Sequence, residues 1–490
     1  MIFKFFFIFF LIILIIKTTE SVDSSVNVHL TKSRAELASS FKESLSFKTI
    51  SFDKDDQNNK IDYSEFLRFH IFLQNKYPLI HKILKKTVIN KYSLLFEWTG
   101  SDKTLKPLLL NSHYDVVPVV DSEWAFNPWG EIRNDNIYGR GTIDNKVVLM
   151  ATMESIEAIL ANNYTQPIRT IYLCFGHDEE IGGLDGHRMI AKHFREISVK
   201  AEAIFDEGCP FLASNFIQGF EDIIAGVGVF EKGYLFYKLT SRINTFTHSA
   251  IPPQESAIGI LSKALSKIES NPFAPVENIE KKNQLLQFFN GETIKSNPFL
   301  NSMTKTTTAL SMVQAGTKPN VIPTTASAWV SHRIINGNSI EFVKSRILDL
   351  INDTRITMEI EAFLEPSPIS SPFTTAYQIL KQTIYQQFGG YNVKVVPTQL
   401  MANTDTRHYW DITDNIYRFI PIVGNFMDFV SIHGNNEKIS IDDYIKTIHF
   451  YKKLILNFQP FSNASSSNHI NKNLKINDYC PNSIYSNNKS

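Results

Sequence analysis

Cysteine is scarce in this chain, and its scarcity excludes a disulfide-based fold. The 490 residues contain three cysteines, Cys174, Cys209 and Cys480. Three thiols are too few for a disulfide framework, and an odd number leaves at least one thiol free. A hydrophobic core must therefore hold the fold, and a chain of this length can form two or three domains.

The sequence also lacks an excess of charge of either sign. Lys and Arg total 49, as do Asp and Glu, so the formal net charge is zero. Nucleic-acid-binding domains carry a net positive field, so a nucleic acid is not an expected partner. Internal repeats are missing as well, which excludes a repeat architecture.

Long apolar runs are missing except near the amino terminus. Lys4 is followed by twelve apolar residues, Phe5 to Ile16, and then by Lys17. Such a run is typical of a signal peptide and is short for a membrane-spanning helix. We therefore predict a signal peptide over residues 1–22, with an uncleaved signal anchor as the alternative. In either case we expect the chain to enter the secretory pathway and to be secreted or lumenal, for example vacuolar or lysosomal. The sequons fit a glycoprotein: Asn163, Asn352, Asn463 and Asn488.

The stretch His177–Gly183 places acidic residues at the end of a predicted strand. The preceding run, Thr170–Phe175, is apolar and rich in β-branched and aromatic residues, as in a buried strand, and a helical pattern follows over residues 186–194. Two adjacent glutamates there, Glu179 and Glu180, can point in different directions, one to a metal and one to a water. Taken alone, the stretch would equally suit a solvated turn before a helix.

Three other predicted strands or strand–helix junctions end in similar residues. His113 follows a predicted strand at residues 107–111, Asp144 precedes a predicted helix, and Asp206 ends a short apolar strand. Each has an ordinary explanation by itself, such as a helix cap for Asp144. Because the carboxyl ends of parallel strands share one edge of a sheet, where ligands bind, their repetition predicts one shared site.

The pattern changes between residues 232 and 366. Its predicted elements are strands at 234–240, 306–314 and 327–333 and helices at 254–268 and 339–352. This alternation is typical of an α+β unit with an antiparallel sheet. We therefore predict an α/β fold whose mainly parallel sheet is flanked by helices and carries an inserted α+β lid. The predicted segments are a catalytic domain in two parts, 23–231 and 367–460, the insert at 232–366, and a disordered Asn/Ser-rich tail at 461–490.

Six motifs resemble those of a known family. They are Tyr92–Asp102, His113–Pro118, Tyr138–Lys146, Gly176–Gly183, Thr404–Tyr409 and His433–Glu437. In order, spacing and predicted context they resemble the two-zinc metallopeptidases that include carboxypeptidase S, the aminoacylases and glutamate carboxypeptidase. The resemblance covers residues 40–460. It is closest to the carboxypeptidase S branch, which includes enzymes that make and cleave N-fatty-acyl amino acids.

The resemblance implies two zinc ions per subunit. The implied ligands are His113 and Asp206 for one ion, Glu180 and His433 for the other, and Asp144 for both. Asp115 would orient His113, and Glu179 would be the general base. Zinc accepts imidazole and carboxylate ligands, and paired ions can share a bridging carboxylate, so the residue types agree with this assignment.

The insert of this family is a lid that also takes part in dimers. The resemblance implies that His248 stabilises the oxyanion of the transition state. It also implies that Asn320, Arg333 and Arg407 hold the substrate, most plausibly through its free carboxylate, to which arginine is suited. Arg333 would equally suit an ion pair on the surface of a strand. The expected partners are a peptide or small-molecule substrate with a free carboxylate and a second copy of the chain.

The expected function is zinc-dependent hydrolysis of an amide or peptide bond next to a free carboxylate, in a carboxypeptidase or a reversible N-acyl-amino acid hydrolase. The alternative is a catalytically inactive, secreted or membrane-anchored binding protein that keeps the fold. Retention of every implied ligand and of Glu179 favours the enzyme. The sequence does not determine the acyl group of the substrate, which could be a fatty acyl or a peptidyl group. Apolar residues at 270–300 would line a lipophilic groove or form the core of the lid.

Overall fold

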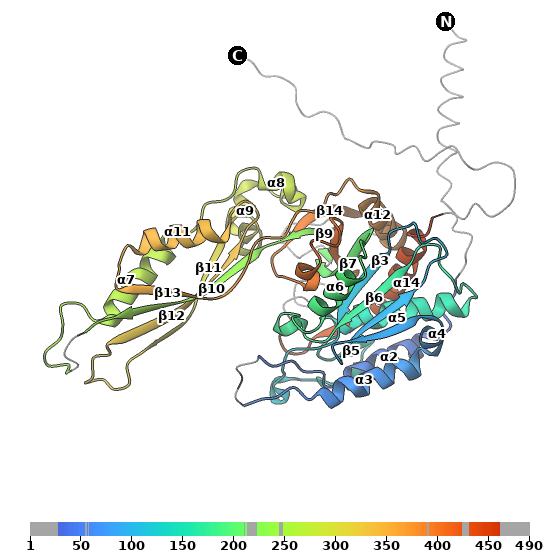
Figure 1. The fold of residues 1–490 in the computed structure, drawn as a ribbon, viewed down its shortest axis with the longest axis horizontal. Coiled ribbons are helices and arrows are strands. Elements are labelled where there is room, and N and C mark those ends of the chain that lie inside the picture. The colour runs from blue at the N-terminus through green and yellow to red at the C-terminus, as the bar shows by residue number, and fades with distance from the viewer. Residues whose placement is uncertain are drawn as a thin grey trace, which may run out of the picture. The chain divides into compact units, whose positions relative to one another are not determined.

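A computed structural model describes residues 28–53, 56, 58–209, 211–212, 223–244, 248–389, 392–423 and 431–460 (Figure 1). The predicted signal peptide, the predicted tail and the sequons at Asn463 and Asn488 lie outside these residues. Within them, no helix combines the length and the apolar character needed to cross a membrane.

Three helices precede the main sheet. They are α2 (Arg34–Leu45), α3 (Tyr63–Lys76) and α4 (Pro78–Ile83). α2 begins with a capping box, in which the Ser33 side chain accepts from the Glu36 amide and the Glu36 carboxylate accepts from the Ser33 amide. β1 (Lys85–Ile89) and β2 (Ser93–Trp98) then pair antiparallel at one edge of the sheet.

The main sheet has the strand order β1-β2-β6-β3-β7-β15-β9-β14 among the described residues, with β8 paired to β9. The bounds of its remaining strands are β3 (Leu108–His113), β6 (Ile171–Gly176), β7 (Ala203–Cys209), β8 (Phe211–Leu212), β9 (Ile223–Glu231), β14 (Val393–Leu400) and β15 (Ile416–Phe419). β3 runs parallel to both β6 and β7, and β15 runs parallel to β7. The predicted parallel centre is therefore confirmed, and its strands end at one edge.

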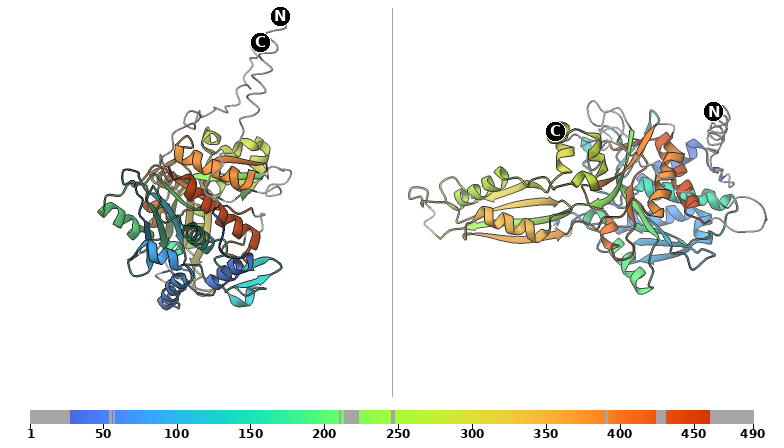
Figure 2. Two further views of the ribbon diagram at one scale, coloured as in Figure 1. Left: turned by 90° about the vertical axis from the view of Figure 1, so that its right-hand side faces the viewer. Right: turned by 90° about the horizontal axis from the view of Figure 1, so that it is seen from above.

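Helices cover both faces of this sheet (Figure 2). α5 (Lys146–Ala161), α12 (Thr375–Phe388) and α14 (Ile441–Asn457) share one core with alternate residues of β3, β6 and β7. The residues between those alternates, such as Leu109 and Ile204, form a second core with α6 (His187–Glu196). Successive residues of a strand face opposite sides, so these two cores lie on opposite faces.

A small antiparallel sheet joins distant parts of the chain. It contains β4 (Glu131–Arg133), β5 (Asn136–Tyr138) and β16 (Lys438–Ser440), in the order β16-β5-β4. Tyr138 pairs with Lys438, so the residues that follow β5 lie beside the residues that precede β16. The sequence predicted none of these three-residue strands.

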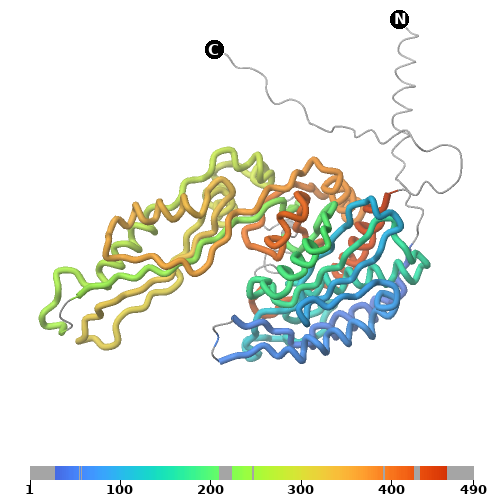
Figure 3. The backbone as a smooth tube through the Cα atoms, viewed as in Figure 1, coloured from blue at the N-terminus to red at the C-terminus, as the bar shows by residue number. Residues whose placement is uncertain are grey.

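The chain leaves the main sheet after β9 and rejoins it at β14, after α12, and the backbone trace shows the separate lobe formed in between (Figure 3). The intervening four-stranded antiparallel sheet has the order β11-β12-β10-β13, with bounds β10 (Gly233–Arg242), β11 (Thr307–Ala315), β12 (Thr325–Ile334) and β13 (Ile356–Leu364). α7 (Ala257–Ser270) and α11 (Ile340–Ile351) pack on it and share its core. We call residues 233–364 the insert. The predicted fold class is confirmed, whereas the predicted domain boundaries stay a prediction.

The segment 270–300 contains several short helices. They are α8 (Ile279–Lys282), the 3-10 helix η3 (Gln284–Phe288), α9 (Gly291–Ser296) and α10 (Pro298–Ser302). Leu285 and Leu286 are buried in the core shared with the main sheet, and Phe273 is buried in the core of the insert. These three residues are therefore core residues and do not line a groove.

Candidate metal centre

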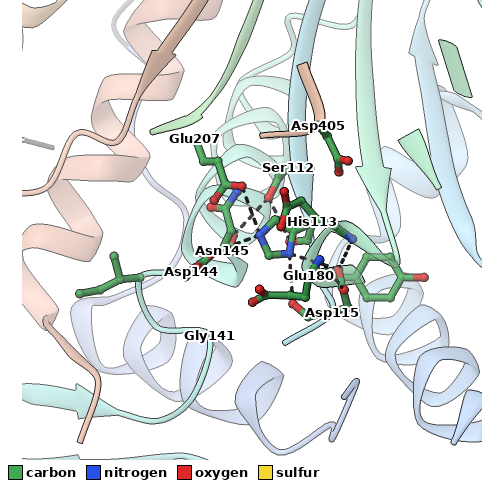
Figure 4. A network of polar contacts seen from close by, with 12 residues as sticks. Ser112, His113, Asp115, Gly141, Asp144, Asn145, Glu180, Glu207 and Asp405 are labelled. Atoms are coloured by element: carbon green, nitrogen blue, oxygen red, sulfur yellow. Dashed lines mark hydrogen bonds and ion pairs between the residues drawn. The ribbon is translucent and has the colours of Figure 1, made fainter. Parts of the chain in front are cut away.

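His113 is the last residue of β3 and lies at the carboxyl edge of the main sheet. Only 1% of it is exposed. Its Nε2 atom lies 3.0 Å from Asp144 Oδ1 and 3.3 Å from Glu207 Oε1, and its Nδ1 atom lies 3.2 Å from Asp115 Oδ1. Figure 4 shows these carboxylates and that of Glu180 around the His113 ring. Burial opposes a charge on His113, but Glu207, Asp115 and Asp144 together raise its pKa well above the usual value.

Asp144 presents one carboxylate oxygen to each of two imidazoles. Its Oδ1 faces His113, and its Oδ2 lies 3.0 Å from His433 Nε2. His433 also lies 3.1 Å from Glu180 Oε2, and these contacts raise the pKa of His433 to about 10. A carboxylate between two imidazoles has the arrangement that a bridging metal ligand requires.

Asp115 connects His113 to the acidic turn after β6. That turn is the 3-10 helix η2 (Glu179–Ile181). The fully buried Asp115 carboxylate accepts hydrogen bonds from the amides of Glu179 (3.1 Å) and Glu180 (3.2 Å) and from the Ser51 hydroxyl (2.7 Å). The Asp115 carboxylate thus fixes the position of the backbone of Glu179 and Glu180 relative to the His113 ring. The sequence did not indicate Ser51.

β7 carries two adjacent carboxylates, Asp206 and Glu207, near its end, and their side chains lie on opposite faces of the strand. Asp206 shares the strand face of Ile204, which packs toward α6. Its Oδ1 accepts the Glu207 amide, and its Oδ2 is buried without a hydrogen-bond partner among the described residues. Glu207, in contrast, reaches His113, and with His113 and Glu179 it forms one of two groups of described residues able to hold an ion. Sequence reasoning missed Glu207, although it belongs to the same acidic strand end.

The donor set fits divalent metal ions. The second group able to hold an ion consists of His113, Asp144 and Glu180. Burial, followed by the charge of Asp144, raises the pKa of Glu180 to about 7, and burial raises that of Glu207 well above its usual range. Glu180 Oε1 is buried without a partner in the part of the chain that the structure describes. Zinc accepts carboxylate and imidazole ligands, and divalent cations would offset the mutual repulsion of these crowded carboxylates.

One arginine contacts the acidic turn, and a second lies within range of the charge of the first. Arg407 is on the 3-10 helix η5 (Asp405–His408), and its Nη2 atom lies 3.3 Å from Glu179 Oε1. Arg333 of β12 donates to Asn403 Oδ1 at 3.0 Å, which connects the insert to the segment before η5. The guanidinium of Arg333 lies over the rings of Tyr234 and Phe236 of β10. Burial, together with the charge of Arg407, lowers the pKa of Arg333.

η5 approaches the acidic turn closely because of a glycine. Gly183 has a φ of +65°, and a Cβ atom there would collide with the Asp405 carboxylate. Burial raises the pKa of Asp405 well above its usual range, and neither carboxylate oxygen has a hydrogen-bond partner among the residues described. Glycine is therefore required where the turn meets η5.

The structure does not bring His248 and Asn320 to the sheet edge. They lie near each other in the insert, where His248 bridges to Val321 and the Ser249 amide donates to the Asn320 carbonyl at 3.3 Å. Both residues are exposed. Within the described ranges, no hydrogen bond or ion pair joins either side chain to His113, Asp144 or Glu179.

Residues 109–457 match the peptidase family M20/M25/M40. "Probable carboxypeptidase S-like 1" of Dictyostelium discoideum is 89% identical over 486 residues, which cover 99% of this chain and 100% of that protein. The mouse "N-fatty-acyl-amino acid synthase/hydrolase PM20D1" is 33% identical over 450 residues, 86% of this chain and 88% of that protein.

A solved structure has the same fold. It is an M20 family metallo-carboxypeptidase, Sso-CP2, from Sulfolobus solfataricus, with a TM-score of 0.67 and 20% identity. The match covers 86% of this chain and 98% of that one. The family match covers most of the chain, from β3 to α14, and includes the candidate metal ligands at the sheet edge. The chain therefore belongs to the peptidase family M20/M25/M40 and is an enzyme of its carboxypeptidase S-like branch.

Proposed function

We propose that the chain is a zinc-dependent hydrolase that cleaves an amide bond next to a free carboxylate, in C-terminally unblocked peptides or in N-acyl amino acids. The observation that carries this proposal is the position of Asp144, with one oxygen toward His113 and the other toward His433. The names of the relatives, carboxypeptidase S-like and N-fatty-acyl-amino acid synthase/hydrolase, support the two substrate classes. Both classes share the free carboxylate.

The proposed ligands divide between two ions. We assign His113 and Asp206 to one ion, Glu180 and His433 to the other, and Asp144 to both. Asp206 is preferred over Glu207 because it stands at the ligand position implied by the family resemblance and its buried Oδ2 atom has no hydrogen-bond partner in the described chain. When bound, zinc lowers the pKa of water and polarises a carbonyl oxygen.

Glu179 is the proposed general base. It stands beside the ligand Glu180, and its backbone is held by Asp115, so its carboxylate can be aimed at the reacting water. Burial, followed by the charge of Asp405, raises its pKa well above the usual range, which favours a carboxylate that takes up a proton. Glu179 removes a proton from the attacking water and returns it to the leaving amine.

The substrate carboxylate is proposed to bind the arginines. Arg407 lies 3.3 Å from Glu179, so a carboxylate held by Arg407 brings the adjacent amide bond close to the base. Arg333 lies close enough to Arg407 for the two charges to interact, and Asn320 would join them from the insert. Arginine offers the paired donors that a carboxylate accepts.

The test compares an acid with its amide. We expect an N-acyl amino acid or a free dipeptide to be cleaved with a kcat/KM at least roughly 30-fold above that of its C-terminal amide, because a lost charge pair costs about 2–5 kcal/mol. The matched protein control is Arg407→Lys, which keeps the charge but loses the paired donors and should reduce the preference. Equal kcat/KM values for acid and amide in the native chain would refute carboxylate recognition.

A secretory location is part of the proposal and rests on the amino-terminal apolar run. Two of the sequons, at Asn163 and Asn352, are exposed and follow the ends of α5 and α11, where an oligosaccharide would not disturb the core. Expression in secreting cells, followed by treatment with an N-glycosidase, should reduce the apparent mass of the chain. No change in mass would contradict this part of the proposal.

A further inference from the structure

Glu437 is a fully buried carboxylate that binds the backbone of a different loop. It lies four residues after His433. Its Oε1 accepts the amides of Ile143 at 2.6 Å and of Asp144 at 3.1 Å, and its Oε2 accepts the amide of Gly141 at 3.2 Å. The segment that contains His433 and Glu437 therefore holds the backbone of Asp144 through the Glu437 side chain.

Arg140 makes the reciprocal contact. Its Nη1 atom donates to Glu437 Oε2 at 2.7 Å, and its Nη2 atom donates to the carbonyl of Gly434 at 2.7 Å. Only 2% of Arg140 is exposed, and its guanidinium lies over the ring of Trp124. The loop that carries Asp144 thus holds the backbone next to His433.

The two loops meet where β5 and β16 pair. Tyr138 pairs with Lys438, and the amide of Gly139 donates to the carbonyl of Glu437 at 2.9 Å. From this point each loop runs to its ligand, and Asp144 Oδ2 and His433 Nε2 end 3.0 Å apart. The buried pair thus joins the two loops that carry these ligands.

Stability alone is a weak explanation for this pair. Burying two charges costs desolvation energy that their attraction often only balances, and apolar residues of similar size can be as stable. Hydrogen bonds from charged groups to backbone are, however, strong and directional. The location of Arg140 and Glu437 therefore points to positioning of the two ligand loops.

We propose that Glu437, paired with Arg140, is a positioning residue. It holds the Asp144 carboxylate next to the His433 imidazole before any metal binds. This inference rests on the proposed metal centre. Ligands held in place by the protein lose little freedom when an ion arrives, so the affinity for metal is higher than for loops that must be ordered by the ion. Glu437 itself contacts neither substrate nor metal and acts only through the backbone of its neighbours.

The test is the zinc affinity of full-length Glu437→Gln, measured by competition with a chromophoric chelator. Changes in residues that orient metal ligands typically cost about 10–100-fold in affinity, and we expect a loss of this order. The matched control is Glu154→Gln, which removes another buried carboxylate from an ion pair, with Lys32 at 2.8 Å, but touches no proposed ligand. The control should keep the zinc affinity of the native chain. A folded Glu437→Gln chain with native affinity would overturn the proposal.

A second measurement needs no substitution and separates this inference from the proposed function. In the metal-free native chain, the amides of Ile143 and Asp144 should exchange with solvent as slowly as those of the central strands, because Glu437 already binds them. Rapid exchange that becomes slow only with zinc would overturn the inference, since the ion would then order the loop. If the native chain binds no zinc, the proposed function fails, and this exchange measurement still decides whether the two loops are held.

Discussion

The sheet edge and the insert supply different residues for the proposed reaction. The residues at the edge already contact one another, whereas two residues of the insert make no contact with them in the part of the chain that the structure describes. At the sheet edge, Asp144 already contacts both His113 and His433. In the insert, His248 and Asn320 are exposed, and no hydrogen bond or ion pair within the described residues joins them to that group. The edge needs only its metal ions, whereas the insert must reach the substrate. Metal binding and proton transfer should therefore depend on the edge, and the transition-state contact of His248 on the insert. Substrate contacts would be shared between Arg407, beside the edge, and the insert residues Arg333 and Asn320.

The largest effect is expected from Glu179→Gln at the sheet edge. The amide cannot carry a proton from water to the leaving amine, so turnover should fall by roughly 10²–10⁴-fold. The zinc content should stay native, because Glu179 is not a proposed ligand. Steady-state kinetics together with metal analysis would check both statements. Native turnover in this variant would show that another group is the base.

A smaller loss is expected from His248→Ala in the insert. An oxyanion donor acts mainly in the transition state, so kcat should fall by roughly 10²–10³-fold, with a smaller change in KM. His193→Ala, on α6 outside the site, is the control. A change confined to KM would make His248 a substrate-binding residue and would weaken the division between edge and insert.

The two carboxylates at the end of β7 should differ in their effect on zinc. Asp206→Asn should weaken zinc binding on the order of 10–100-fold, because it removes a proposed ligand. Glu207→Gln should weaken it less, although Glu207 lies 3.3 Å from His113. Calorimetric titration of both metal-free variants would decide the order. The opposite order would make Glu207 the ligand.

The insert should have its own pH dependence, with little effect on the rate at neutral pH. His332 of β12 is buried between Tyr237 and Thr308, and burial lowers its pKa to about 4. The unfolded chain binds this proton near pH 6.5, so stability is lost as the pH falls from 6.5 toward 4. Between pH 7.5 and pH 5 the loss attributable to His332 is about 2 kcal/mol.

The comparison that isolates His332 is the urea unfolding of His332→Gln and of the native chain at pH 7.5 and pH 5. The variant should be less stable at pH 7.5 because it loses packing, but it should lose less stability on acidification. If both chains lost equal stability on acidification, His332 would not be buried in its neutral form.

The convergence at the sheet edge was predictable because it depends on local patterns. Apolar runs that end in His113, Glu180 and Asp206 each indicate a strand that stops at a polar residue. Parallel strands joined by helices then place these ends together. The strands β3 and β6 and the helix α6 lie within a few residues of their predicted bounds for the same reason.

Other parts depend on contacts between distant residues and could not be predicted. Arg140 and Glu437 are 297 positions apart, and neither shows by itself that it is buried in an ion pair. β4, β5 and β16 have three residues each, too few for a periodic pattern. Adjacent carboxylates such as Asp206 and Glu207 are equivalent in sequence, and only the alternation of the strand separates them.

The central claim is that this edge binds two metal ions through a shared Asp144. The most direct test is the zinc content of the purified full-length chain by native mass spectrometry, with the rate of hydrolysis measured on the same sample. The account predicts two zinc ions per active chain, loss of both zinc and activity in Asp144→Ala, and recovery of the chelator-treated native chain on addition of zinc. A fully active preparation without bound metal would contradict it.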